Sequence, residues 1–582
     1  MTEFQEDDNR FTTGNGKFNP DFLQQFEVTL DPLPHDRQYF ESHLEFTSNY
    51  FRTVSGNQLN ITWEVLPEIV TLPHEMAAYS PLGQEGDENY KLADLANDTW
   101  TIVRQNGLLS GRNFDPDRTM FIIFHAGAGR DLELTGTTLT KTPQDIPSVY
   151  LSKNSLQRLL QQPDFQGFPI SESGRVTNTA ILPETQSRPG EDVLGNEFVL
   201  ELSINGILTA QIGSFLGLPD LFNTENGRSG IGRFGLMDGA GFFSYFGLFP
   251  PEPSAWEKVA LGWIQPIDIT DMVNEPATFD IPAAALHQPG SILKYRFTSE
   301  EYYLIENRHR DINNTGVTLT IRQPDGTITN VNLNNSERRF DPFDFSKIDE
   351  VLPPGVLINV SNFDWSLPGG LDPGPDRQYD TPDDRILNGG ILIWHIDESV
   401  IKSKFESNTI NNDPDRRGIR LVEADAAQDI GRPSAGVTGY DQGNPFDFWW
   451  SGNNFTVITA TGQRIILYQN RLGDDTIPNN RTNSGARTFF ELYDFSDTAP
   501  VASFSIRRTE LDDIRKLPDI QLPLSDYSQP AANQTQYSLS VNVFVQPDND
   551  TLLIVPTPST LTAFSTSYNQ VASRFESNRP DI

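Results

Sequence analysis

The sequence predicts an α+β protein: a mixed domain of helices and strands, then an all-β sandwich domain, then a short extra C-terminal β segment. Three observations predict this order. Helical segments and a buried strand alternate in the first half of the chain. After about Gln265, short alternating segments separated by Gly, Pro, Asn and Asp replace them. The 38 Phe, 43 Gly and 41 Pro suit aromatic-rich sheets joined by turns better than a helical bundle.

The mixed domain is expected over residues 25–264, after a flexible, polar N-terminal arm over residues 1–24. Apolar side chains that recur every three to four residues predict helices, whereas alternating or continuous apolar runs predict strands. These patterns predict helices over residues 35–50, 91–105 and 197–216 and strands over residues 59–66 and 118–125. The last helix is apolar on most faces, which predicts a central, buried position, and Gly217 and Pro219 end it.

The sandwich domain is expected over residues 265–510. The predicted strands are short and alternate in polarity, and they are residues 293–297, 302–306, 317–322, 356–360, 390–395, 419–423 and 488–493 and, beyond the sandwich, 537–545 and 551–555. The aromatic run Phe446–Trp450 is expected to pack into the core rather than to form a binding surface. Residues 511–535 are rich in Pro, Gln and Ser and predict a linker. Residues 536–582 either pack on the sandwich or begin a further domain.

The composition of the 582 residues excludes several classes of protein. A formal net charge of −36 opposes binding to nucleic acid or to anionic membrane surfaces, and it suits cation binding or simple solubility. The absence of cysteine removes disulfides, thiolate zinc sites and cysteine nucleophiles. No apolar run reaches about 18 residues, so no membrane span is expected. Met1–Asp8 is acidic and polar, unlike a signal peptide, so a secreted protein would lack its export signal in this chain.

The third predicted helix has the frame of a zinc-peptidase motif without its metal-binding side chains. That motif reads H-E-x-x-H-x-x-G-x-x-(H or D). Gly217 and Asp220 occupy the last two places, but the histidine positions hold Ala210 and Ser214, and the glutamate position holds Gln211. Ala210 and Ser214 are one helical turn apart, so their side chains share one helix face.

Further segments extend this likeness, and the chain resembles the immune-inhibitor-A family of secreted bacterial metallopeptidases. The resemblance covers roughly residues 25–510 and is most specific over residues 207–263. The segments that carry it are Gly217–Leu221 (GLPDL), Phe234–Asp238 (FGLMD), Ser254–Lys258 (SAWEK), Leu261–Trp263 (LGW), Gly389–Glu398 (GGILIWHIDE) and Leu421–Asp425 (LVEAD).

The resemblance implies a zincin-like metallopeptidase domain followed by a β-sandwich, export from the cell, and loops supported by calcium. It implies that Met237 lies in a Met-turn below the metal site and that Asp220 is the third zinc ligand. The family's two zinc histidines would fall at Ala210 and Ser214, and its general base would fall at Gln211.

These replacements predict a protein without peptidase activity. A catalytic zinc site needs about three protein ligands and one open position. An alanine methyl has no lone pair, a neutral serine hydroxyl is a poor zinc ligand, and Asp220 alone would hold zinc weakly. A glutamine amide cannot take a proton from zinc-bound water. We therefore expect zinc to be absent and Asp220 to be a vestige of the third ligand position.

Other residues do not restore this chemistry. No two histidines have the four-residue spacing of the zinc motif, and each is expected to be a structural histidine with satisfied hydrogen bonds. The seven histidines are His35, His43, His74, His125, His287, His309 and His395. No G-x-S-x-G elbow occurs, and the Ser214 hydroxyl is expected to bond a backbone carbonyl within the helix.

Two groups of acidic residues are compatible with calcium, which takes about six to eight oxygen ligands from irregular loops. Neither group has EF-hand spacing. The first group is Asp372, Asp376, Asp380, Asp383 and Asp384, and the second is Asp413, Asp415, Glu423, Asp425 and Asp429. A solvated acidic loop explains this composition equally well, and the family resemblance favours calcium.

The sequence therefore favours a catalytically inactive, metallopeptidase-like protein that is secreted or held at the cell surface. It would act by binding a peptide, a glycan or a protein, or by self-assembly, because an unpaired β edge can accept a neighbour's strand. Two alternatives stay open. The chain is a secreted zinc endopeptidase whose motif has been inactivated by engineering, or it is a subunit of an extracellular polymer.

Overall fold

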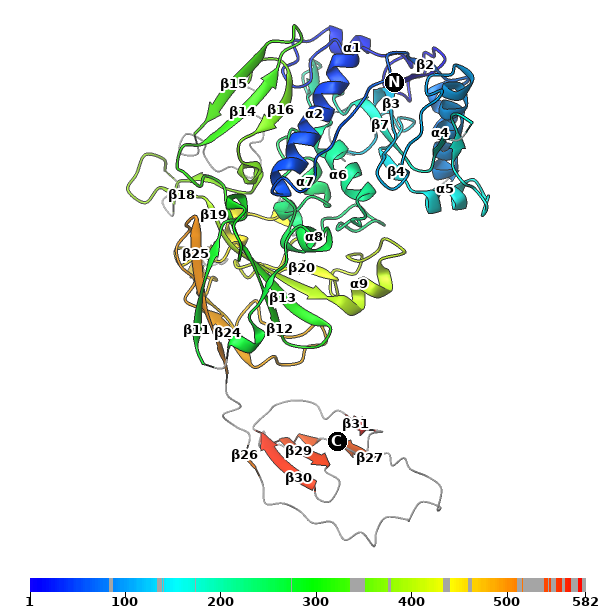
Figure 1. Cartoon of the computed structure of the whole chain (residues 1–582). Coiled ribbons are helices and arrows are strands. Elements are labelled where there is room, and N and C mark those ends of the chain that lie inside the picture. Colours follow the sequence, from blue (N-terminus) through cyan, green and yellow to red (C-terminus); the bar gives the residue numbers. More distant parts are fainter. Residues whose placement is uncertain are drawn as a thin grey trace, which may run out of the picture. The chain divides into compact units, whose positions relative to one another are not determined.

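The computed structural model shows a mixed α+β chain with several sheets (Figure 1), which confirms the predicted class. Two compact units are present. One contains Met1–Thr488 and Leu492–Ile506, and the other contains Phe489–Glu491 and Arg507–Ile582. The structure describes the strands β26–β31 beyond residue 509, and before it residues 1–509 except 83–86, 133–138, 140, 173, 274, 335–350, 375–377, 433–439 and 459–462.

A five-stranded sheet forms the first layer of the N-terminal half, in the order β2-β1-β3-β7-β4. The first four strands pair in parallel, and β4 is antiparallel to β7 at one edge. β7 is buried along its whole length, as expected for a parallel strand covered on both faces. The bounds are β1 Thr2–Glu3, β2 Val70–Thr71, β3 Ile122–Ala128, β4 Val149–Leu151 and β7 Thr179–Thr185.

Residues 1–24 are not the loose arm that their composition suggested. Thr2 pairs with Val70 and with His125, so β1 is an interior strand of the sheet. Phe4 is fully buried, and its ring lies 5.9 Å from the ring of Tyr79. Two strand residues and one buried ring anchor a segment whose average composition is polar.

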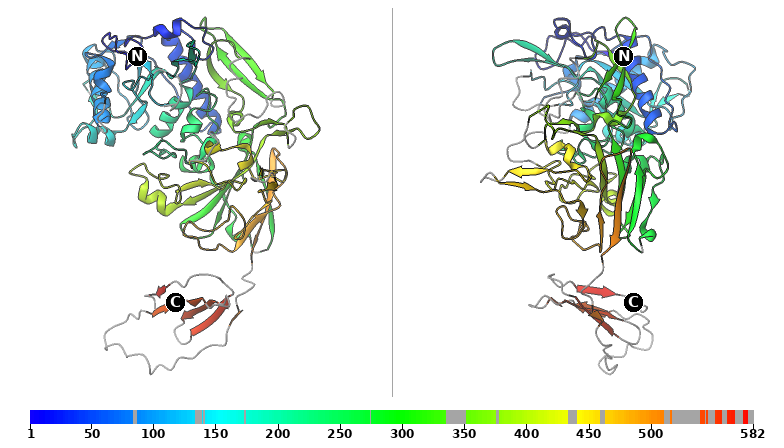
Figure 2. Two further views of the ribbon diagram at one scale, coloured as in Figure 1. Left: turned by 180° about the vertical axis from the view of Figure 1, so that it is seen from behind. Right: turned by 90° about the vertical axis from the view of Figure 1, so that its left-hand side faces the viewer.

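The longest described helices pack around this sheet. The predicted helices over residues 35–50 and 91–105 are confirmed, and the first begins at Asp36, whose carboxylate accepts a hydrogen bond from the Tyr39 amide. α2 lies between α6 and the β14–β16 sheet, as Figures 1 and 2 show. α2 and α6 belong to the main hydrophobic core, whereas α4 belongs to a second one. The bounds are α2 Arg37–Val54, α4 Asp87–Gln105 and α6 Asn205–Phe215.

The helix expected over residues 197–216 is shorter than predicted. Glu197–Leu200 forms β9 instead, which pairs with β8 (Arg188–Glu191) in an antiparallel hairpin. The Asp192 carboxylate accepts a hydrogen bond from the Asn196 amide and closes the hairpin turn. A short apolar run fits a strand or a helix equally well, and this turn determines that the run is a strand.

Two predicted strands also change. The structure assigns no strand to residues 59–66. Leu59 and Ile61 pack against the main core, and their backbone groups bond the side chains of Ser55 and Ser48. Their alternation therefore reflects one-sided packing rather than a hydrogen-bonded ladder. The apolar strand expected over residues 118–125 is β3, which starts at Ile122 and continues to Ala128.

After residue 265 the chain forms several separate sheets. The predicted strands between residues 293 and 493 each overlap an observed strand. β14 alternates between buried and half-buried residues, whereas β19 is buried along its whole length. One sheet has the order β10-β12-β13-β19-β20, another β11-β25-β24-β23, and a third β15-β14-β16. The third sheet packs against α2, where the Asn49 side chain donates to the Ile358 carbonyl.

The strands of these sheets are β10 Ile267–Asp268, β11 Ala277–Pro282, β12 Ile292–Arg296, β13 Glu301–His309, β14 Val317–Arg322, β15 Ile328–Leu333, β16 Val356–Val360, β19 Gly389–Asp397, β20 Ile419–Leu421, β23 Arg471–Leu472, β24 Phe490–Tyr493 and β25 Val501–Arg508. Shorter elements are α1 Asp21–Gln24, α3 Met76–Tyr79, α5 Lys153–Leu159, α7 Gly239–Phe242, α8 Ala255–Ala260, α9 Glu398–Lys404, β5 Phe168–Pro169, β6 Arg175–Val176, β17 Gly370–Asp372, β18 Arg385–Leu387, β21 Thr456–Ile458 and β22 Arg464–Ile466. No helix among the described residues is both long and apolar enough to cross a bilayer.

The aromatic run Phe446–Trp450 packs into the core, as predicted. Phe448 and Trp449 are almost fully buried, and the Trp449 indole N–H donates to the Val422 carbonyl. The run thereby fixes the turn η7 (Pro445–Asp447), which overlaps its start, beside the segment that follows β20.

The second unit contains the strands expected near residues 537–545 and 551–555. One sheet has the order β26-β30-β29-β28, and β27 pairs with β31. The bounds are β26 Arg515–Lys516, β27 Leu539–Asn542, β28 Phe544–Val545, β29 Thr551–Pro556, β30 Leu561–Thr566 and β31 Arg574–Ser577. Most of the linker expected over residues 511–535 lies outside the described residues.

Candidate functional site

On α6, the two positions that hold histidine in the motif are occupied by a buried alanine and by a serine that bonds the helix backbone. Ala210 is 1% exposed and belongs to the main core. The Ser214 hydroxyl donates to the Ala210 carbonyl at 3.3 Å, as expected for a serine within a helix. Ala210 therefore offers no lone pair to a metal ion, and Ser214 offers only a neutral hydroxyl oxygen, which is a poor zinc ligand.

Gln211 occupies the general-base position between them. Its side-chain oxygen is buried and has no hydrogen-bond partner among the described residues. An amide oxygen carries no proton-accepting charge, so it cannot activate water as a carboxylate does. The buried methyl, the engaged hydroxyl and this amide together do not fit a zinc ion.

Met237 lies directly against α6. Gly213 allows this approach, because a Cβ at that position would lie 2.7 Å from the Met237 sulfur. The Met237 amide donates to Glu257 at 2.7 Å, and its carbonyl accepts from the Leu221 amide at 2.7 Å. Asp238 then caps α7. The turn is thus fixed by hydrogen bonds on both sides, at the place where the family resemblance puts a Met-turn.

Asp220 forms a reciprocal pair with Asn408. Its carboxylate accepts from the Asn408 side-chain nitrogen at 2.6 Å, and its backbone amide donates to the Asn408 side-chain oxygen at 2.9 Å. Burial, together with the charge of Asp238, raises the pKa of Asp220 above its usual value. The Asp220 carboxylate is therefore held by a residue that follows α9, and no sequence pattern pointed to Asn408.

The first predicted acidic loop uses its carboxylates internally. Asp372 forms an ion pair with Arg385 at 3.0 Å across the β17–β18 hairpin. Asp384 accepts from the Asp380 amide at 2.7 Å, and Asp383 accepts from a neighbouring threonine hydroxyl at 2.8 Å. Asp376 lies outside the described residues. Within the described part of this loop, the structure brings no three acidic side chains together as a metal site.

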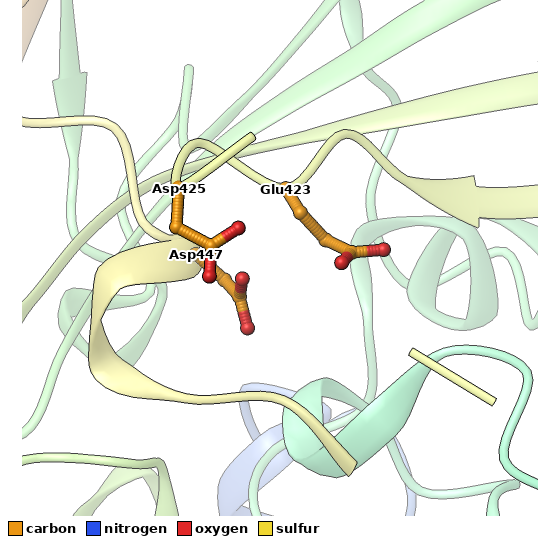
Figure 3. A group of neighbouring side chains, drawn as sticks. All are labelled: Glu423, Asp425 and Asp447. Carbon is orange, nitrogen blue, oxygen red and sulfur yellow. The ribbon is translucent and has the colours of Figure 1, made fainter. Parts of the chain in front are cut away.

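A different acidic group does converge. Glu423, Asp425 and Asp447 each offer one carboxylate oxygen within 4.8 Å of the others. Glu423 and Asp425 follow β20, and Asp447 comes from η7 (Figure 3). All three side chains are buried, and Asp425 and Asp447 have no exposed surface. The sequence suggested the first two as part of an acidic run but gave no reason to add Asp447.

Burial dominates the electrostatics of this acidic group. It raises the pKa of Glu423, Asp425 and Asp447, and the charges of the neighbouring carboxylates raise those of Glu423 and Asp447 further. Asp429, at the rim, has a pKa raised to about 6 for the same two reasons. Such a group is unfavourable in its ionised form unless something positive compensates it.

The histidines are mostly structural, as expected. His35 contacts Glu184 at 2.8 Å and the Asp31 carbonyl at 2.9 Å, and His395 contacts Glu301 at 2.7 Å. His43 and His125 differ, because the Nε2 atom of each ring is buried without a hydrogen-bond partner among the described residues.

Comparison of the chain with protein-family models, with curated proteins and with solved structures finds no match in any of the three.

Proposed function

We propose that the chain is a secreted, metallopeptidase-like protein that binds its partner without cleaving it. The observation that carries this proposal is the set of side chains on α6. Ala210 is a buried methyl group, the Ser214 hydroxyl is bound to the helix backbone, and Gln211 replaces a base. None of these groups holds zinc or activates water.

The surroundings of α6 support a zincin-like scaffold for this protein. Gly217 has a φ of +99°, which turns the chain immediately after the helix. Met237 packs below Gly213, as described above. The antiparallel edge strand β4 lies beside the helix, and the rings of Tyr150 and Phe215 are 6.1 Å apart. These features support a peptidase-like packing around α6, although the side chains that would bind zinc and activate water are replaced.

Among the partners expected from the sequence, an extended peptide is favoured. β4 (Val149–Leu151) is the terminal strand of its sheet among the described residues. A terminal strand presents backbone donors and acceptors to which an extended peptide adds as a further strand. A glycan has no peptide backbone that could pair in register with such an edge.

Metal analysis combined with a protease assay tests the proposal. The purified chain should contain far less than one zinc per molecule after dialysis against zinc, and it should leave casein intact. Stoichiometric zinc together with cleavage that a chelator abolishes would overturn the proposal.

The alternative of a silenced peptidase has its own test. The triple change Ala210→His, Gln211→Glu and Ser214→His restores the motif on α6. Because Ala210 is 1% exposed in the main core, we expect the larger imidazole to fit poorly and activity to stay absent. Strong, chelator-sensitive cleavage by a folded triple variant would instead support an enzyme silenced by these changes alone.

A further inference from the structure

The acidic group of Glu423, Asp425 and Asp447 is separate from the residues of α6 and from the first predicted acidic loop. We propose that these three carboxylates bind one hard divalent cation, calcium in preference to magnesium. This inference is independent of the proposed function, because it rests on other residues and concerns another property.

An orphaned oxygen of Asp447 is the observation that points to a ligand. One Asp447 oxygen accepts from the Asn444 amide at 2.6 Å. The other, Oδ1, is buried and has no hydrogen-bond partner among the described residues, although the side chain has no exposed surface. Figure 3 shows the Asp447 carboxylate directed toward that of Asp425. A buried, ionised oxygen in this position is strongly unfavourable until a cation binds it.

Arg417 compensates the group only in part, and none of the described residues forms an ion pair with these three carboxylates. Arg417 is the arginine whose charge acts most directly on Glu423, but its guanidinium donates to the Ile430 carbonyl at 2.7 Å. The remaining contacts are neutral: Asp425 accepts from the Asn444 side chain at 2.9 Å, and Glu423 accepts from the Asp429 amide at 2.6 Å. These hydrogen bonds orient the carboxylates while leaving their charge unbalanced.

The donor set selects the kind of ion. Every candidate ligand is a carboxylate oxygen, whereas zinc prefers imidazole or thiolate donors. Magnesium usually keeps several waters and takes only one or two carboxylates, whereas calcium accepts several carboxylates from irregular backbone together with carbonyls and water. Glu423 and Asp425 lie in irregular chain after β20, which suits calcium.

The ion is expected to hold η7, which carries Asp447, against the segment that follows β20 and carries Glu423 and Asp425. Residues on both sides of Asp447 lie against the segment that precedes Met237. The rings of Phe234 and Phe448 are 5.3 Å apart, and a Cβ on Gly232 would lie 2.7 Å from the Gln442 carbonyl oxygen. A cation that joins Asp447 to Glu423 and Asp425 therefore also stabilises the turn below α6.

The experiment uses the full chain, stripped with EGTA and dialysed against calcium or magnesium, followed by metal analysis and thermal unfolding. The test variant is Asp447→Asn, which keeps an oxygen for the Asn444 amide but removes the charge. The control is Asp413→Asn, an exposed acid whose oxygen accepts from the Asp415 amide, a bond that asparagine can also make.

Asp447→Asn is expected to lower the unfolding temperature in calcium but not in EGTA. In calcium, Asp447→Asn should bind one calcium fewer than the wild type and unfold at a lower temperature. In EGTA, it should unfold at the same or a higher temperature, because one buried charge has been removed. Asp413→Asn should match the wild type in both, and magnesium should raise the wild-type Tm less than calcium.

Two results would overturn the proposal. One is equal calcium content in the wild type and in Asp447→Asn. The other is a variant that unfolds at a higher temperature in both calcium and EGTA, which would show that the carboxyl groups share a proton instead. Asp425→Asn, which keeps an oxygen for the Asn444 side chain, provides a second variant should Asp447→Asn not fold. Calcium titration of the wild type by calorimetry decides independently of either variant.

Discussion

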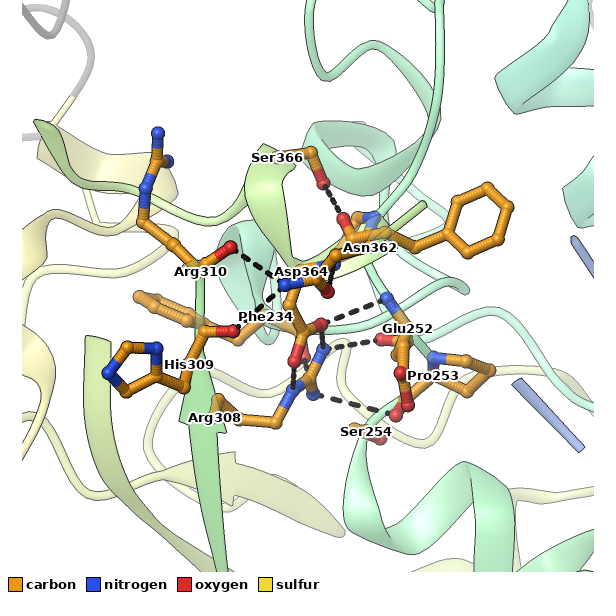
Figure 4. A network of polar contacts seen from close by, with 12 residues as sticks. Phe234, Glu252, Pro253, Ser254, Arg308, His309, Arg310, Asn362, Asp364 and Ser366 are labelled. Carbon is orange, nitrogen blue, oxygen red and sulfur yellow. Dashed lines mark hydrogen bonds and ion pairs between the residues drawn. The ribbon is translucent and has the colours of Figure 1, made fainter. Parts of the chain in front are cut away.

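Arg308 carries a charge with no exposed surface at the centre of the first unit. Its Nε atom donates to Asp364 at 2.7 Å, and its other nitrogens donate to the carbonyls of Glu252 and Phe234 at 2.8 and 3.2 Å (Figure 4). Arg308 lies on β13, and Asp364 lies in the short helix η5 (Phe363–Ser366). The guanidinium thus joins the sheet to the segment before α8 through satisfied donors.

Removing the acidic partner should be costly. We expect Asp364→Asn to lower the free energy of unfolding by about 3 kcal/mol or more, because it leaves the buried Arg308 charge without its main counter-ion. Asp268→Asn is the matched control, since Asp268 pairs with Arg296 at 2.8 Å on the surface and should cost less than about 1 kcal/mol. Urea unfolding of both variants measures the difference, and equal losses would contradict it.

His125 is the other residue whose burial has a measurable consequence. Its ring is fully buried on β3, and burial lowers the pKa of His125 from 6.5 to about 4. The folded protein therefore keeps this ring neutral at a pH at which the unfolded chain binds a proton. The neutral His125 ring therefore costs no free energy of unfolding well above pH 6.5, and the protein loses stability as the pH falls from 6.5 toward 4.

Acidification should therefore act partly through this one side chain. Between pH 7.5 and pH 5 we expect His125 to contribute a loss of about 2 kcal/mol in the free energy of unfolding. His125→Gln, which does not titrate, should show a pH profile that is shallower by this amount. Urea unfolding at several pH values measures both profiles, and parallel profiles would sink the prediction.

Among the elements, α6 makes a very close backbone approach to α7. A Cβ at Gly206 would lie 1.9 Å from the Phe242 carbonyl oxygen, so the first turn of α6 packs directly on the end of α7. The Gly206 amide donates to the Gly247 carbonyl at 2.8 Å in the same contact. Backbone atoms cannot move aside as a flexible side chain can.

This contact predicts that the same glycine-to-alanine change destabilises the protein at one position and is tolerated at another. Gly206→Ala should lower the free energy of unfolding by about 2 kcal/mol or more, because the added methyl forces α6 away from α7. Gly239→Ala, at the start of α7, is the control, since a Cβ there meets nothing within 4 Å. It should be neutral or slightly stabilising. Thermal unfolding compares the two, and a tolerated Gly206→Ala would refute the close approach.

The elements also show what a sequence can predict. Periodic runs such as those of α2 and β14 were placed within a few residues, because one buried face imposes a regular pattern. Glu197–Leu200 was assigned to a helix, because its apolar run carries no period and the Asp192 turn decides its structure. The loss of motif chemistry on α6 was visible from spacing alone, since helical neighbours are fixed by sequence.

The acidic group could not be predicted in the same way. Glu423 and Asp425 are near neighbours in the chain, but Asp447 joins them only because the aromatic run that contains it packs into the core. Asn408 reaches Asp220 across 188 residues for a similar reason. Contacts of this kind depend on tertiary packing, which a single sequence does not specify.

At the scale of the whole molecule, charge is the dominant feature. The chain has 79 acidic and 43 basic residues, for a formal net charge of −36. Surface ion pairs such as Lys402 with Glu300, 3.0 Å apart, are weak and leave most of the excess uncompensated. Self-repulsion of this size opposes the compact state at low ionic strength.

Salt should therefore stabilise the fold rather than weaken it. Raising NaCl from about 10 mM to about 300 mM shortens the screening length from about 30 Å to below about 8 Å, which weakens the repulsion between acidic side chains. We expect Tm to rise over this range at pH 7.5 in EGTA, which removes any contribution from calcium. The rise should shrink near pH 5, close to the sequence pI of about 4.5, where little net charge remains to be screened. A Tm that falls with salt at pH 7.5 would mean that favourable ion pairs outweigh the excess of negative charge.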